Sequence, residues 1–120
     1  MSYIIEKVCR LFMGKHDAVK LYDGENYLGM MLHVKSMSNT GNVAVNTKEF
    51  QFSVREGTKC EGVLFEDFNG EQILVSVAKA KELFKNGMSR HSEKDGGDFV
   101  TIPFDQIKLV NDGIDPGFPF

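Results

Sequence analysis

The sequence lacks tryptophan and has only two cysteines and three prolines among its 120 residues. Cys9 and Cys60 both lie in apolar stretches, where an unpaired cysteine usually behaves as a small buried hydrophobe. No apolar run approaches the roughly 20 residues that a membrane-spanning helix needs. Glu6, Lys7 and Arg10 interrupt the N-terminal apolar residues before the core of a secretory signal forms. We therefore expect a cytoplasmic protein with reduced thiols and no membrane contact.

Motifs for catalysis, metal binding and phosphate binding are also missing. There is no G-x-S-x-G, G-x-G-x-x-G or P-loop sequence, each of which places a nucleophile or a phosphate cradle on a defined turn. His16, His33 and His91 stand far apart and form none of the spacings of a zinc site. We therefore predict no enzyme activity, no catalytic residue, no metal and no cofactor.

The composition is that of an ordinary folded domain. Hydrophobic residues make up 42% of the chain, charged residues make up 26%, and ten residues are phenylalanine. A chain of this length buries about two-thirds of its extended surface on folding, enough for one hydrophobic core. The formal net charge of −3 disfavours a general nucleic-acid binder, which needs clustered Lys and Arg. We predict one globular domain over residues 1–112.

The N-terminal residues carry apolar side chains at helical spacing. Five of them define one face: Ile4, Ile5, Val8, Leu11 and Phe12. Ser2 can cap such a helix and Gly14 can end it. The spacing predicts a helix over residues 2–13, and it places His16 just after a helix end, where a cation is favoured.

From Val19 the apolar period changes to two, which is typical of strands. Asp23-Gly24 predicts a hairpin between residues 19–22 and 27–37, and Asn69-Gly70 predicts a second hairpin between residues 60–68 and 72–77. Alternation predicts further strands at residues 43–45, 50–54, 99–102 and 106–110.

Residues 76–86 return to helical spacing, with Ser76 as the cap and Asn86-Gly87 as the stop. Residues 88–98 are polar and aperiodic, which predicts a loop. Together these segments predict an α+β fold: a small antiparallel β barrel or a strongly bent sheet of six to eight short strands, with an N-terminal helix and one later short helix. A two-layer sheet with both helices on one face is the alternative.

Charge is segregated along the second half of the chain. Residues 79–94 hold five basic and two acidic residues, whereas residues 95–120 hold one basic and five acidic residues. Five side chains of the first segment are predicted to form a ligand-binding basic rim: Lys81, Lys85, Arg90, His91 and Lys94. A solvated helix face and loop is the alternative interpretation.

The C-terminal residues 113–120 form an extended aromatic tail in which two prolines preclude a helix. Phe118 and Phe120 are predicted to contact a partner or a second copy of the chain. Packing back on the domain's own sheet is the alternative.

These features favour a non-enzymatic intracellular binding protein whose expected partner is another protein, as in small inhibitors from phages or mobile elements. One alternative is a protein that binds or sequesters small phosphorylated, nucleotide-like ligands through the basic rim. Nucleic acid is a less favoured ligand for the same rim. A second alternative is a structural subunit that assembles into homo-oligomers.

Overall fold

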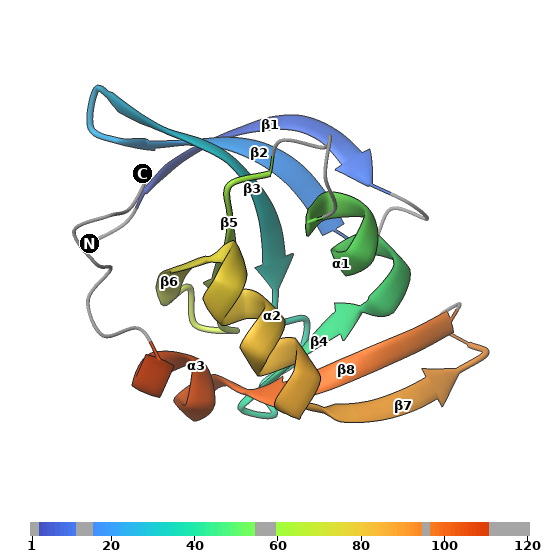
Figure 1. Ribbon diagram of the computed structural model, residues 1–120. Helices are drawn as coiled ribbons and strands as arrows, with labels where there is room; N and C mark the ends of the chain where they lie inside the picture. The colour runs from blue at the N-terminus through green and yellow to red at the C-terminus, as the bar shows by residue number, and fades with distance from the viewer. Residues whose placement is uncertain (1–2, 12–15, 55–59, 95–96, 111–120) are drawn as a thin grey trace.

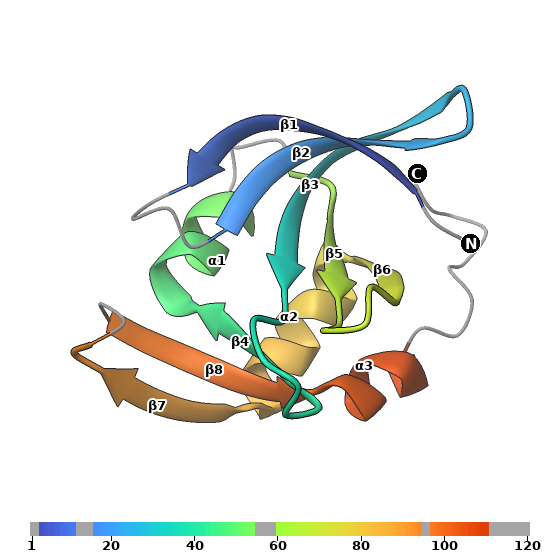
Figure 2. The same ribbon diagram turned by 180° about the vertical axis from the view of Figure 1, so that it is seen from behind.

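The computed structural model describes residues 3–11, 16–54, 60–94 and 97–110. Within these residues the chain forms eight strands and three helices arranged in two sheets (Figures 1 and 2). The fold is therefore α+β, as predicted. None of the described helices is long and apolar enough to cross a membrane.

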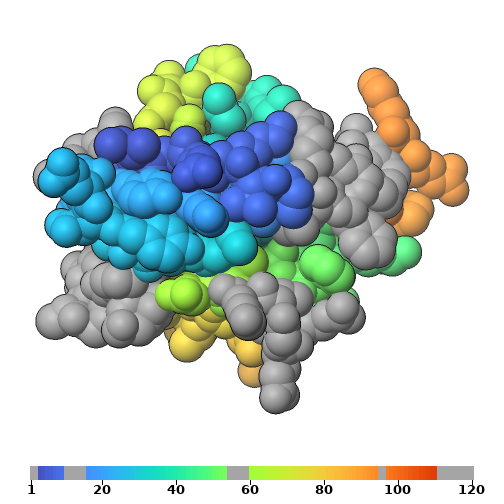
Figure 3. Space-filling view, turned by 90° about the horizontal axis from the view of Figure 1, so that it is seen from above, coloured from blue at the N-terminus to red at the C-terminus, as the bar shows by residue number. Residues whose placement is uncertain are grey.

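The larger sheet has the strand order β1-β2-β3-β5-β6. Its strands are β1 (Ile4–Leu11), β2 (His16–Asp23), β3 (Asn26–Lys35), β5 (Gly62–Glu66) and β6 (Gln72–Ser76). Strands β3 and β5 pair in parallel, whereas the other neighbours are antiparallel. Figure 3, seen from above, shows β1 and the β2–β3 hairpin in blue and cyan across the middle of this face.

The smaller sheet has the strand order β4-β8-β7, with antiparallel neighbours. It consists of β4 (Asn42–Asn46), β7 (Met88–Ser92) and β8 (Gly97–Pro103). The helices are α1 (Thr47–Val54), α2 (Val77–Asn86) and α3 (Phe104–Val110). The connection between the parallel strands β3 and β5 thus contains β4 and α1, in keeping with the long crossover that parallel pairing requires.

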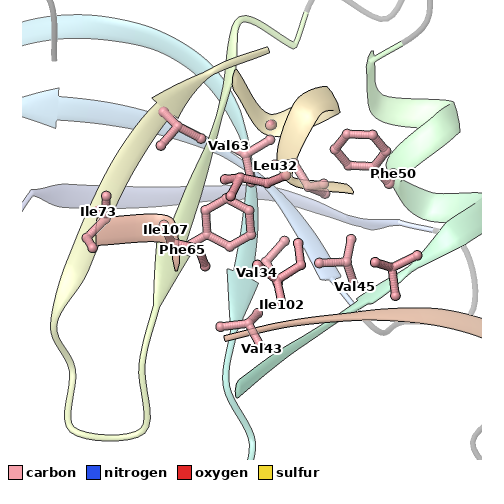
Figure 4. Close-up of a cluster of buried hydrophobic side chains, with 14 of the residues drawn as sticks. Leu32, Val34, Val43, Val45, Phe50, Val63, Phe65, Ile73, Ile102 and Ile107 are labelled. Atoms are coloured by element: carbon pink, nitrogen blue, oxygen red, sulfur yellow. The ribbon is translucent and has the colours of Figure 1, made fainter. Parts of the chain in front are cut away.

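One core cluster joins the two sheets and the three helices (Figure 4). Val34 and Phe65 of the larger sheet pack in the same cluster as Val43 and Ile102 of the smaller sheet. The ring of Phe50 on α1 stacks on that of Phe84 on α2, with ring centroids 4.4 Å apart. Alternate residues of β2, β3, β5 and β6 form a second cluster on the opposite face of the larger sheet: Val19, Leu21, Met31, Leu64 and Leu74.

The predicted barrel or strongly bent antiparallel sheet is wrong. Among the described strands, the larger sheet ends at β1 and β6 and the smaller sheet ends at β4 and β7. The larger sheet is also mixed, because β3 and β5 run parallel. Counting strands does not reveal how they divide between sheets, since each sheet buries the same kinds of side chain.

The predicted N-terminal helix is also wrong, because residues 4–11 form β1. A bulge between Lys7 and Cys9 shifts the register with β2, and such a shift interrupts the strict alternation of a strand. The resulting apolar spacing imitates a helix. Ile4, Ile5 and Val8 are β-branched residues, which favour strands. His16 consequently begins β2 and does not follow a helix.

Two predicted strands are helices. Residues 50–54 belong to α1, in which the buried residues Glu49, Phe50 and Ser53 have helical spacing. Residues 106–110 belong to α3, which buries Phe104 and Ile107. In α1 two of the buried residues are polar, and α3 has only two buried residues. The helical spacing of apolar residues is therefore not visible in either sequence.

The predicted loop over residues 88–98 contains β7 and the start of β8. The side chains of β7 are exposed over Met88–His91. This edge strand therefore lacks the apolar alternation from which a strand is predicted. By contrast, both predicted hairpins and α2 are confirmed. The side chain of Ser76 accepts a hydrogen bond from the Lys79 backbone N–H, as expected of a helix cap.

Candidate functional site

The five residues of the predicted basic rim lie on three segments. Lys81 and Lys85 are exposed on α2, Arg90 and His91 are exposed on β7, and Lys94 is exposed in the turn after β7. The orange segment that projects at one edge of Figure 3 contains the end of this strand and the turn. That these five side chains bind one ligand remains a prediction.

Arg90 and His91 face opposite sides of the smaller sheet, because neighbouring residues of a strand alternate in direction. Arg90 pairs with Phe99 of β8, and its guanidinium carbon lies 5.4 Å from the centroid of the Phe99 ring. His91 pairs with Asp98, and its Nδ1 lies 2.6 Å from Asp98 Oδ1. The two basic side chains of β7 therefore have different surroundings.

Arg90 lines a cavity of about 450 Å³ that both sheets help to form. Its walls are the start of β2, the end of β3, the segment that follows β3, and parts of β4, β7 and β8. These strands are labelled in Figure 2. The described lining residues are His16, Lys35, Ser36, Met37, Ser38, Thr40, Asn42, Ala44, Arg90, Phe99 and Thr101. A volume of this size lies within the range of about 300–1,000 Å³ that is usual for small-molecule sites.

Strand alternation places the lining side chains of the smaller sheet. On β8, Val100 and Ile102 belong to the main core cluster, so Phe99 and Thr101 face the other side and line the cavity. Ala44 of β4 pairs with Thr101 and lines the cavity beside it. One face of this sheet therefore builds the core and the opposite face builds the cavity.

No carboxylate occurs among the described lining residues of this cavity, although the chain has 17 acidic residues. The neighbouring cavity between α2, α3 and β8 contains Glu82, and a smaller cavity beside the β5–β6 turn contains Asp67 and Asp105. Cationic or basic side chains in the first cavity come from His16, Lys35 and Arg90. The charged side chains among the described lining residues, Lys35 and Arg90, are therefore both positive, which favours an anionic ligand.

Arg90 is the principal cation of the cavity. The ammonium group of Lys35 lies 3.7 Å from Glu66 Oε2, which offsets part of its charge. Among the described residues, no carboxylate lies within 4.0 Å of the Arg90 guanidinium, which instead lies over the Phe99 ring. The planar guanidinium group of an arginine presents several donors side by side, which suits a phosphate or carboxylate.

His16 connects the cavity wall to the start of α1. Its Nε2 accepts a hydrogen bond from the Asn46 backbone N–H at 3.1 Å, and its own backbone N–H donates to Glu49 Oε1 at 2.7 Å. Asn46 Oδ1 in turn accepts from the Glu49 backbone N–H at 3.0 Å and caps the helix. Because Nε2 is an acceptor, the neutral imidazole carries its proton on Nδ1.

Several polar groups of the cavity can donate hydrogen bonds. Arg90 and the ammonium group of Lys35 only donate. Thr40 Oγ1 accepts from the Asn42 backbone N–H at 3.3 Å, so its hydroxyl hydrogen points to a different acceptor. A ligand rich in acceptor oxygens matches this lining.

The segment after β3 is held at both ends by backbone hydrogen bonds. Ser36 N–H donates to the Glu66 carbonyl at 2.8 Å, and Phe104 N–H donates to the Gly41 carbonyl at 2.8 Å. The Ser36 hydroxyl also lies within hydrogen-bond distance of the Ser38 and Asn42 carbonyls. This wall of the cavity is thus preorganised.

The chain matches no family model, no curated protein and no solved structure.

Of the residues predicted to bind a ligand, Arg90 lines the cavity, whereas Lys81, Lys85, His91 and Lys94 are not among its lining residues. Phe118 and Phe120 lie outside the described residues, as does the whole tail 113–120. Sequence analysis missed the segment 36–42 because its serine, asparagine and threonine residues have the composition of an ordinary turn. The segment is also far from Arg90 in the sequence, so no sequence pattern indicates that both line one cavity.

Proposed function

We propose that the protein is a non-enzymatic binding protein for a small anionic ligand, held in the cavity between the two sheets. The observation that carries this proposal is the Arg90 guanidinium in a cavity whose described lining contains no carboxylate. An anion there gains charge-assisted hydrogen bonds, which contribute about 1.5–3 kcal/mol each. The proposal refines the basic-rim hypothesis by replacing an exposed rim with a partly enclosed site.

The lining supports binding more than catalysis. His16 is the lining residue most suited to general acid-base chemistry, but its Nε2 is engaged by the Asn46 backbone N–H. The described lining also lacks a cysteine or a carboxylate that would act as a nucleophile or base. We therefore assign the cavity to recognition or sequestration of its ligand.

The test is isothermal titration calorimetry with inorganic phosphate at constant ionic strength, using the full chain and two variants. Arg90→Ala removes the proposed anion contact, whereas Lys85→Ala removes one positive charge from the exposed face of α2. We expect Arg90→Ala to weaken binding by about tenfold or more, which corresponds to about 1.4 kcal/mol. Lys85→Ala should change the affinity by less than about twofold, because Lys85 does not line the cavity and salt screens its charge from a distant anion.

Equal weakening in the two variants would show that phosphate responds to overall charge, and absence of binding to the unmodified chain would reject the proposal. A second candidate function is binding of a macromolecular partner through single exposed apolar side chains, among them Met37, Met88 and Leu109, which are 86%, 74% and 74% exposed. The same titration separates the two, because partner binding through these residues requires no phosphate affinity that depends on Arg90.

A further inference from the structure

We infer that the ligand is a phosphate ester of a hydroxylated, uncharged body: a sugar phosphate, either free or as part of a nucleotide. This inference rests on the proposed function and names its ligand class. It follows from the size of the cavity, the distribution of its charge and the polarity of its walls.

The cavity is too large for a lone phosphate. Its volume of about 450 Å³ is some fifteen times the share of about 30 Å³ that one water molecule takes in the liquid. The lining also extends across the whole smaller sheet, from Arg90 on β7 to Ala44 on β4. Neighbouring strands lie about 4.8 Å apart, so these two strands are separated by about 10 Å. A ligand bound at Arg90 therefore has room for a body that reaches β4.

The cavity provides one strong site for negative charge. Arg90 stands at the β7 side, while the charge of Lys35 is partly offset by Glu66 at 3.7 Å. The imidazole of His16 accepts a backbone hydrogen bond at Nε2 and is therefore neutral in this arrangement. This distribution suits a single anionic head at Arg90 and an uncharged remainder, and it disfavours a ligand with several separated charges.

The remaining lining presents polar and apolar surface in similar amounts, which favours a body that carries both hydroxyl groups and carbon-bound hydrogens. Small-molecule sites are usually lined mostly by apolar side chains, but only Met37, Ala44 and Phe99 are apolar among the described lining residues here. An apolar ligand body would desolvate the hydroxyls of Thr40 and Thr101 without replacing their hydrogen bonds. Sugar hydroxyls both donate and accept, so they satisfy these groups.

The experiment measures the affinity of the full chain for ribose 5-phosphate, inorganic phosphate, ribose and AMP by titration calorimetry at one ionic strength. We expect ribose 5-phosphate to bind at least tenfold more tightly than inorganic phosphate, and ribose to bind at least a hundredfold more weakly than its phosphate. AMP distinguishes the two sources of the ligand: tighter binding than ribose 5-phosphate indicates a nucleotide, and equal or weaker binding indicates a free sugar phosphate.

Thr101→Val keeps a β-branched side chain on β8 but removes the hydroxyl. We expect it to weaken ribose 5-phosphate about tenfold while changing the affinity for inorganic phosphate by less than twofold. Thr40→Val provides a second measurement of the same kind from another wall, in case one variant does not fold as judged by circular dichroism.

The inference is overturned if inorganic phosphate binds as tightly as ribose 5-phosphate, or if the threonine variants weaken both ligands equally. In either case an Arg90-dependent affinity for phosphate would leave the proposed anion site standing. Failure of inorganic phosphate to bind the unmodified chain would instead reject the proposed function itself.

Discussion

The thiol of Cys60 lies just before β5, where it is partly buried against Ser53 of α1. Burial raises the pKa of Cys60 to about 11, and nearby Cys9 and Glu61 add to the rise, while a hydrogen bond with Ser53 opposes it. At neutral pH this cysteine is therefore a protonated thiol. Since the thiolate is the reactive form, Cys60 resembles a structural cysteine more than a nucleophile.

We predict that iodoacetamide labels Cys60 slowly at pH 8, and that the labelling rate continues to rise up to about pH 11 because the thiolate fraction grows throughout this range. Peptide mass spectrometry after short exposures measures the rate for each cysteine separately. A labelling rate for Cys60 that levels off below pH 9 would contradict the assigned pKa.

The raised pKa of Cys60 also makes the folding stability depend on pH. The folded protein holds the Cys60 proton more tightly than the unfolded chain, whose thiol pKa is near 9.0, so folding stability falls as the pH rises from about 9 to about 11. Other groups titrate in this range, and Cys60→Ser serves as the reference: its urea midpoint should fall less over the same interval.

At the scale of the element, the junction between α2 and β7 depends on Gly87. Its backbone N–H donates to the Phe84 carbonyl at 3.3 Å, and its φ of −78° is accessible to any residue. The requirement for glycine is steric. An added Cβ would lie 3.0 Å from the Thr101 carbonyl oxygen and closer still to Val100 Cγ1.

We predict that Gly87→Ala destabilises the protein by about 1–3 kcal/mol, the usual cost of an extra methyl group in a packed site. Urea unfolding followed by circular dichroism measures the change. The crowding atoms belong to β8, so relief would require the helix end and the sheet to separate.

Gly24→Ala is the matched comparison, because Gly24 has a φ of +63° and no atom within 4 Å of an added Cβ. Its cost should be about 1–2 kcal/mol from backbone conformation alone. If Gly87→Ala cost less than about 1 kcal/mol, the close approach of α2 to β8 would not constrain this junction.

At the scale of the whole molecule, one core cluster contains residues from both sheets and from all three described helices. Each sheet has a face in this cluster, and α1 and α2 meet within it through the Phe50–Phe84 stack. Neither sheet can separate without exposing the other's buried face. We therefore expect the two sheets to unfold together.

The aromatic composition provides a direct measurement of this cooperativity. Because the chain has no tryptophan, its intrinsic fluorescence comes from Tyr3, Tyr22 and Tyr27, which lie before or within the first strands of the larger sheet. Circular dichroism at the helical wavelengths reports on the helices. We predict coincident urea transitions by the two probes, whereas separate midpoints would show that the larger sheet unfolds independently.

Local chemistry determined the elements that the sequence predicted correctly. Asp23-Gly24 and Asn69-Gly70 form their turns because these residues tolerate positive φ, as at Gly24 and Gly70 with φ of 63° and 90°. Ser76 begins α2 because its side chain accepts a helix N–H that has no partner within the helix. Each interaction involves residues only a few positions apart, so the sequence by itself determines it.

Tertiary structure decided the remaining elements and the site. β1 is a strand because β2 pairs with it around a bulge, and β7 is a strand because β8 provides its partner, although neither segment has a clean alternation. The cavity requires Lys35 of the larger sheet and Arg90 of the smaller sheet to line the same space. Sequence patterns report which side chains are to be buried, but not which distant segment buries them, because that choice depends on packing between sheets.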